Sequence, residues 1–131
     1  MSQGNVEIIL DSFEAFSRGD LDAVVAILDE DVEWKQIEEP EPVRGPEAVL
    51  QAVGRWTEMW DGARVSVREC IDAGDTVVLL LHWSGRSKAS GVPAEQSAYN
   101  VFTMRAGKVV RMREYGADSR AEALTAAGVS G

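Results

Sequence analysis

Hydrophobic residues follow a helical spacing in the first part of the chain. One amphipathic helix is predicted over residues 5–18. Gly19 ends it, and Asp20 can cap a second helix. Gly45-Pro46 begins a third helix, which Asp61-Gly62 ends. The apolar face of this third helix is predicted to comprise Val49, Ala52, Val53, Trp56, Met59 and Trp60.

The second part of the chain changes to the alternating spacing of strands. After a short early strand around Val32 and Trp34 and a loop over 38–42, four strands follow the third helix. The two central ones are predicted over about residues 76–84 and 95–105. A capping box at Ser119–Glu122 opens a last helix, which Gly128 ends. This order predicts one α+β domain over residues 1–131, with a mostly antiparallel sheet curved into a cone and wrapped by N-terminal helices.

The strand over residues 76–84 is apolar on both faces. Val77, Leu79, Leu81 and Trp83 share one face, whereas Val78, Leu80 and His82 share the other. Helices are expected to cover only one face of such a sheet, and an apolar second face needs a cover of its own. We therefore expect a homodimer that forms through Val78, Leu80 and His82. Burial by loops of the same chain is the alternative.

The last strand carries one acidic residue on its apolar side. Val110, Met112 and Glu114 are expected to share the inward face, because arginines such as Arg111 and Arg113 seldom lie in a core. A carboxyl group in apolar surroundings suits general acid or base work, so Glu114 is the candidate catalytic residue. A β-bulge would reverse such assignments.

The composition excludes several classes of function. The chain of 131 residues carries a net charge of −9, which argues against nucleic acid and anionic membranes as partners. A single cysteine, Cys70, cannot form an internal disulfide, and we expect a cytoplasmic protein. With one histidine and one cysteine, the usual ligands of a metal site are missing, and no nucleotide-binding fingerprint is present. We expect no metal, no cofactor, and no Ser-His-Asp triad built on an outward His82.

Aromatic side chains give the best indication of a pocket. All four tryptophans fall on inward or helix-core faces, where phenylalanines can join them. They either fill a core or line a cavity for a small hydrophobic ligand. The candidate ligand-binding residues are Phe13, Trp34, Gln36, Trp56, Trp60, Trp83, Asn100, Phe102 and Met112.

Several segments together resemble the SnoaL-like branch of the nuclear transport factor two-like superfamily, which includes ketosteroid isomerases, polyketide cyclases and limonene epoxide hydrolases. The segments are 18–23, 31–34, 74–78, 101–105, 107–111, 120–124 and 127–129. The resemblance covers nearly the whole chain and implies a cone-shaped sheet, usually in a homodimer. In the epoxide hydrolases, an inward carboxylate on the last strand works with an Arg and an Asp on the long middle strand. Glu114 matches the first position, but Leu81 and Trp83 occupy the other two, so that activity is not expected.

Three functions remain open. The first is an isomerase or cyclase in which Glu114 moves a proton while Gln36, Asn100 or Tyr99 donates a hydrogen bond to an oxyanion. The second is a module that binds a small hydrophobic molecule without chemistry. The third is an assembly domain that pairs through its sheet.

Overall fold

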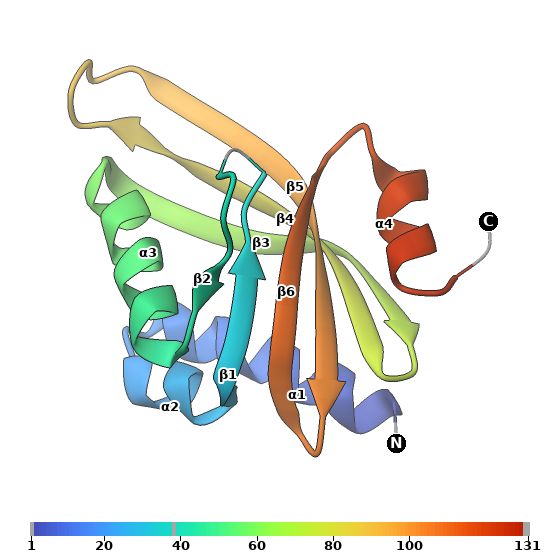
Figure 1. Ribbon diagram of the computed structural model, residues 1–131. Coiled ribbons are helices and arrows are strands. Elements are labelled where there is room, and N and C mark those ends of the chain that lie inside the picture. Colours follow the sequence, from blue (N-terminus) through green and yellow to red (C-terminus); the bar gives the residue numbers. More distant parts are fainter. Residues whose placement is uncertain (1, 38, 130–131) are drawn as a thin grey trace.

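The computed structural model describes residues 2–37 and 39–129, and Glu38 of the predicted loop lies outside these ranges. Two helices, two strands and a third helix come first, and four long strands and a short helix follow (Figure 1). The elements are α1 Ser2–Ser17, α2 Leu21–Ala26, β1 Leu28–Lys35, β2 Val43–Arg44, α3 Pro46–Glu58, β3 Trp60–Ala73, β4 Thr76–Ser87, β5 Pro93–Arg105, β6 Lys108–Gly116 and α4 Arg120–Ala126. The short strand β2 is the one element that the sequence pattern did not predict.

Local sequence signals account for where most helices begin. The Asp20 side chain accepts a hydrogen bond from the Ala23 N–H at 3.2 Å, so the predicted cap of α2 is confirmed. Gly45 precedes α3 with a φ of 88°, a conformation that favours glycine, and Pro46 follows in the first turn. Ser119 precedes α4 as predicted. Its side chain makes no capping hydrogen bond, so the predicted capping box does not form.

The end of α3 differs from the prediction. The helix stops at Glu58, and Trp60 is the first residue of β3. Met59, expected on the buried helix face, is 56% exposed. The helical spacing therefore continues in the sequence beyond the point where the backbone turns into the sheet.

The six strands form one sheet in the order β2-β1-β6-β5-β4-β3. All neighbouring strands are antiparallel except β1 and β6, which run parallel. The predicted α+β class with a mostly antiparallel curved sheet is confirmed. Figure 1 shows α1, α2 and α3 on one side of the sheet and α4 on the other.

A bulge in β6 corrects one assignment of strand faces. The pairing with β5 shifts between Thr103 and Met104, because Met104 pairs with Val109 while Thr103 pairs with Arg111. Val109 is therefore only 1% exposed and belongs to the main core, although alternation alone grouped Val110 with the inward residues. Beyond the bulge, Met112 lies in the core as predicted.

Both faces of the sheet are covered in part by the chain itself. The inward face packs against α1 and α3 in a core that includes Ile9, Val49 and Leu79. On the outer face, Val78 and Val101 form a second core with Ala123 of α4. Val78 is 0% exposed without a second subunit. The expectation that helices cover only one face, and with it the assignment of Val78 to a subunit interface, is therefore wrong.

A polar cluster ties α4 to the outer face. The Arg120 side chain bonds both carboxylate oxygens of Glu69 on β3, with Nη2 to Oε2 at 2.9 Å. The Tyr99 hydroxyl, on β5, donates to Glu69 Oε1 at 3.1 Å. The hydrogen bonds from Arg120 lower the pKa of the Glu69 carboxyl group most, burial raises it by less, and the bond from Tyr99 lowers it further. Burial and Glu69 raise the pKa of Tyr99.

This cluster predicts an acid-sensitive attachment of α4. Because the pKa of Glu69 is lowered in the folded state, its contribution is present above the ordinary carboxyl pKa and is lost as pH falls through the lowered value. We expect the hydrogen-exchange protection of the α4 amides to fall at acid pH more than that of β4. Glu69→Gln should lower α4 protection at neutral pH and flatten its acid dependence. Equal acid loss in both proteins would contradict this role.

Candidate ligand-binding site

A cavity of about 120 Å³ lies between the inward face of the sheet and helices α1, α2 and α3. Its walls are almost entirely apolar. The helices contribute residues such as Ile9, Val24 and Val53, and the strands contribute Leu81 and Val109. Such a mainly apolar concavity with few polar groups is the usual form of a small-molecule site.

Most of the predicted site residues meet in this cavity. The side chains come from α1 and from four strands, and strand alternation explains why they point inward. Those that line it are Phe13, Trp34, Trp83, Asn100, Phe102, Met112 and Glu114.

Four residues that were considered for the site lie elsewhere. Trp56 and Trp60 line a second cavity of about 110 Å³, which shares Trp83 with the first. Gln36 follows the end of β1 and lines neither of the two. Tyr99 was considered as a donor to an oxyanion. Its side chain lies on the outer face and donates to Glu69, so it does not reach the main cavity and that prediction is wrong.

The polar end of the main cavity is formed by two neighbours on adjacent strands. Asn100 of β5 pairs directly with Glu114 of β6, so their side chains leave the sheet side by side on its inward face. Asn100 is 5% exposed, and its amide nitrogen lies 3.5 Å from the Ala98 carbonyl oxygen, at the long limit of a hydrogen bond. The Ile37 N–H donates to Glu114 Oε1 at 3.2 Å. This bond holds the carboxylate at the edge of the cavity.

One polar residue of the lining, Ser12, was not expected from the sequence pattern. Ser12 of α1 lies beside the predicted Phe13, and its hydroxyl donates to the Ile9 carbonyl at 2.6 Å. A serine on the border of an apolar helix face is a weak signal, because it is equally common on the solvent side. Its hydroxyl oxygen remains able to accept a hydrogen bond.

The aromatic side chains form the wall between the two cavities. Trp83 lies with its ring centroid 4.4 Å from that of Trp56 and 6.2 Å from that of Phe16, both nearly edge to face. Trp56 and Trp60 are 5.6 Å apart and tilted by 38°. The tryptophans thus partly fill the core and partly line the two cavities.

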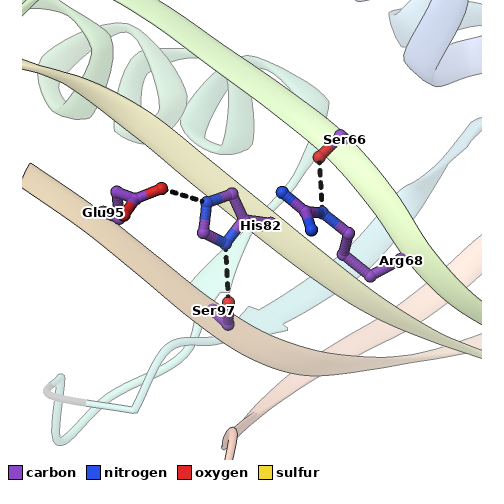
Figure 2. Close-up of polar contacts among 5 residues, drawn as sticks. All are labelled: Ser66, Arg68, His82, Glu95 and Ser97. Carbon is purple, nitrogen blue, oxygen red and sulfur yellow. Dashed lines mark hydrogen bonds and ion pairs between the residues drawn. The ribbon is translucent and has the colours of Figure 1, made fainter.

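His82 lies on the outer face, as its position in β4 predicted. Figure 2 shows its ring between two side chains of β5, with Nδ1 2.9 Å from Ser97 Oγ and Nε2 2.9 Å from Glu95 Oε1. A serine, a histidine and a carboxylate are therefore in contact, which the sequence analysis did not expect. Nearby on β3, Arg68 Nε donates to Ser66 Oγ at 3.2 Å.

The described residues hold neither a cluster of metal ligands nor a membrane-spanning helix. No three His, Cys, Asp or Glu side chains in residues 2–37 and 39–129 gather as metal ligands. Over the same residues, no helix has the length and apolar character needed to span a bilayer.

Comparison with known proteins agrees with this fold. A family model for the SnoaL-like domain matches residues 9–112. No curated protein sequence matches the chain.

Solved structures resemble the chain over most of its length. A nuclear transport factor two-like protein from Burkholderia xenovorans is 30% identical, with a TM-score of 0.74 over 88% of this chain and 90% of that one. TerC, crystallised with polyporic acid, is 25% identical, with a TM-score of 0.74 over 88% and 92%. A proposed SnoaL-like polyketide cyclase from Jannaschia is 21% identical, with a TM-score of 0.80 over 88% and 86%, and shows the shared fold alone.

Proposed function

The chain belongs to the SnoaL-like family of the nuclear transport factor two-like superfamily, and we propose that it is an isomerase or cyclase that acts on a small hydrophobic carbonyl compound in the main cavity. The observation that carries this proposal is the pairing of Asn100 with Glu114 at the polar end of an otherwise apolar cavity. One side chain can donate a hydrogen bond and the other can accept a proton. Apolar walls hold the rest of the substrate.

The two side chains divide the chemistry between them. Glu114 takes a proton from the carbon next to the substrate carbonyl, and the electrons of the broken C–H bond move onto the carbonyl oxygen. The Asn100 amide donates to that oxygen as negative charge develops. Glu114 then returns the proton to another carbon in an isomerisation. In a cyclisation, the enolate carbon attacks a second carbonyl within the molecule, and the alkoxide that forms takes the proton back from Glu114.

The relatives support a small-molecule ligand. TerC was crystallised with polyporic acid, and the Jannaschia protein is a proposed polyketide cyclase. Both share the fold that here encloses the cavity. Polyporic acid and the polyketides named for these two proteins give the class of molecule to be tested. The proposed hydrogen bond to Asn100 makes the carbonyl oxygen the part of the molecule to be varied.

A matched pair of probes tests the polar end of the cavity. Acetophenone and α-methylstyrene have nearly the same shape, but only the first has a carbonyl oxygen. We expect Asn100→Leu to weaken acetophenone binding about fivefold, the effect of one hydrogen bond, and to leave α-methylstyrene binding nearly unchanged. Equilibrium dialysis of both probes measures this. An equal change for both would contradict the assignment of Asn100 as a donor to the ligand.

Binding without chemistry is the second candidate function. The observation that favours it is that Glu114 is the only acidic side chain among the described residues that line the main cavity. A single carboxylate can take up and return one proton, as in the isomerisation above, but it cannot supply a separate general acid in the same step. A protein that binds the carbonyl probe yet does not exchange its protons would be such a module.

A homodimer through the outer sheet face remains part of the proposal. The area around Leu80 and His82 is only partly buried, whereas α4 covers Val78. We expect Leu80→Asp to halve the mass in solution, because it places a charge in an apolar contact. Light scattering measures the mass. A wild-type protein that is already a monomer would end this part of the proposal.

A further inference from the structure

We infer that Ser97, His82 and Glu95 form a second reactive site, on the outer face of the sheet, in which the Ser97 hydroxyl takes the acyl group of a small activated ester. The site adds to the main cavity and does not depend on the chemistry proposed there. Figure 2 shows the order of contacts on which it rests: a carboxylate holds a histidine, and the histidine contacts a serine. The same three groups activate serine nucleophiles on unrelated folds, where geometry and not chain order defines them.

Strand pairing fixes this arrangement. His82 of β4 lies directly opposite Ser97 of β5, and Glu95 comes two residues before Ser97 on the same strand. Residues two apart on a strand share a face, so both β5 side chains lie beside the ring. Each of the two contacts measures 2.9 Å, the length of a well-formed hydrogen bond.

The partners of the imidazole ring decide which of its nitrogens carries the proton. A carboxylate only accepts hydrogen bonds, so the Nε2–H group of His82 donates to Glu95. In a neutral imidazole the other nitrogen then has a lone pair, and Nδ1 accepts from the Ser97 hydroxyl. His82 is therefore placed to take the Ser97 proton when the serine oxygen attacks a substrate.

The cluster is open to solvent and lies outside both cavities. The His82 side chain is 18% exposed, the Glu95 side chain is 72% exposed, and Ser97 is half-buried. Neither cavity includes His82 or Ser97 in its lining. An open sheet surface contacts little of a substrate, so binding contributes little to the reaction. The substrate is therefore a small ester with a good leaving group, such as an aryl ester.

A bulge in β3 adds a positive charge beside the cluster. The pairing of β3 with β4 shifts between Val67 and Glu69, so Arg68 is an extra residue. Figure 2 shows its guanidinium group on the face that carries His82, and its Nε donates to Ser66, the β3 partner of His82. The two Nη groups can donate to the ester carbonyl oxygen as negative charge develops there.

The reaction has two steps. The Ser97 oxygen bonds to the ester carbonyl carbon while His82 takes the hydroxyl proton, and the bond from that carbon to the alcohol oxygen breaks. His82 gives the proton to the departing alcohol, which leaves an acyl-serine. A water molecule then attacks the acyl-serine by the same route and releases the carboxylic acid and the free serine.

Labelling with para-nitrophenyl acetate tests the inference. The release of para-nitrophenolate gives the rate, and peptide mass spectrometry shows which residue carries the acetyl group, since the exposed thiol of Cys70 can react with such esters too. Diethyl para-nitrophenyl phosphate is the second probe, because its serine adduct is hydrolysed far more slowly and accumulates. We expect the phosphate adduct on Ser97.

Variants separate the roles of the neighbouring groups. His82→Gln removes the base and should lower the rate of Ser97 labelling by about 100-fold or more. Arg68→Gln should lower it about tenfold, the effect of a hydrogen bond from a charged group. Ser84→Ala removes another hydroxyl from the same face and should leave the rate unchanged. Labelling of Ser97 at the wild-type rate in His82→Gln would overturn the inference.

Glu95 acts through His82 and is a positioning residue. The amide of Glu95→Gln can donate to the ring as well as accept, so it no longer fixes the tautomer. Nitrogen chemical shifts of the imidazole should place the proton on Nε2 in the wild type and on both nitrogens in the variant, with labelling of Ser97 reduced about fivefold. A proton held on Nδ1 in the wild type would overturn the inference.

The homodimer proposed above uses part of the same face. A contact through Leu80 and His82 would cover Ser97, and the reaction then belongs to the separate subunit. Labelling is therefore measured on the wild type and on Leu80→Asp, with light scattering to give the mass of each. A Ser97 adduct in either protein supports the inference, and the lack of one in both overturns it.

Discussion

Glu114→Gln is expected to lower the rate at which the protein exchanges the methyl protons of acetophenone for deuterium by about 100-fold or more, the usual contribution of a general base. Glutamine keeps the shape of the side chain but cannot take up a proton at this position. The neighbouring Asn100 stays in place because it is held by the strand pairing. Proton spectra of acetophenone in deuterated water follow the exchange directly, without knowledge of the natural substrate.

Two controls separate catalysis from folding and binding. Glu122→Gln removes a carboxylate from the exposed side of α4 and should leave the exchange rate unchanged. The affinity of Glu114→Gln for acetophenone should stay within about twofold of wild type, because the ligand contacts Asn100 in either case. If exchange continued at the wild-type rate in Glu114→Gln, the carboxylate would not be the base. If wild type showed no exchange while binding the probe, the binding module would be the better account.

Leu79→Ala is expected to lower the free energy of unfolding by about 3 kcal/mol, within the range of 2–5 kcal/mol for such truncations. Leu79 is 0% exposed and lies on β4, in the centre of the inward core. Its removal leaves a space that neighbouring strands cannot fill without breaking their pairing. A domain of this size is stable by only about 5–15 kcal/mol, so the loss is a large part of the total.

Urea unfolding measures this loss, with Val92→Ala as the matched control. Val92 is 57% exposed, and its truncation should change stability by no more than about 0.5 kcal/mol. A loss at position 79 as small as that at position 92 would mean that the inward face of β4 is not the core. The assignment of the cavity to that face would then fail as well.

The fold could be predicted from the sequence wherever the local alternation of residues was regular. Leu79 and Leu81 alternate with outward residues along β4 without interruption, so their faces were predicted correctly. The bulge before Arg111 left no local signal, because it depends on how β6 pairs with β5. The cover of Val78 by α4 was also missed, since a short helix of seven residues does not reveal in its sequence which face it packs on.

For the candidate site too, the prediction held within regular strands and failed at the ends of elements. Asn100 and Glu114 lie on regular parts of adjacent strands. Glu114 was predicted to face inward because arginines flank it, whereas Asn100 was one of three candidate donors between which the sequence did not decide. Trp60 was assigned to a helix, and Gln36 to the pocket, because each lies at the end of an element. Ends of elements depend on tertiary contacts that a pattern does not contain.

The most direct test of the main cavity follows the Trp34 indole and Asn100 amide signals by nuclear magnetic resonance during titration with acetophenone. Both residues line the cavity from different strands, and Asn100 is the proposed donor to the carbonyl oxygen. We predict that both signals move together and saturate at the same concentration of probe. If both stay in place while signals of the outer sheet face move, the cavity is not the binding site and the proposed function is wrong.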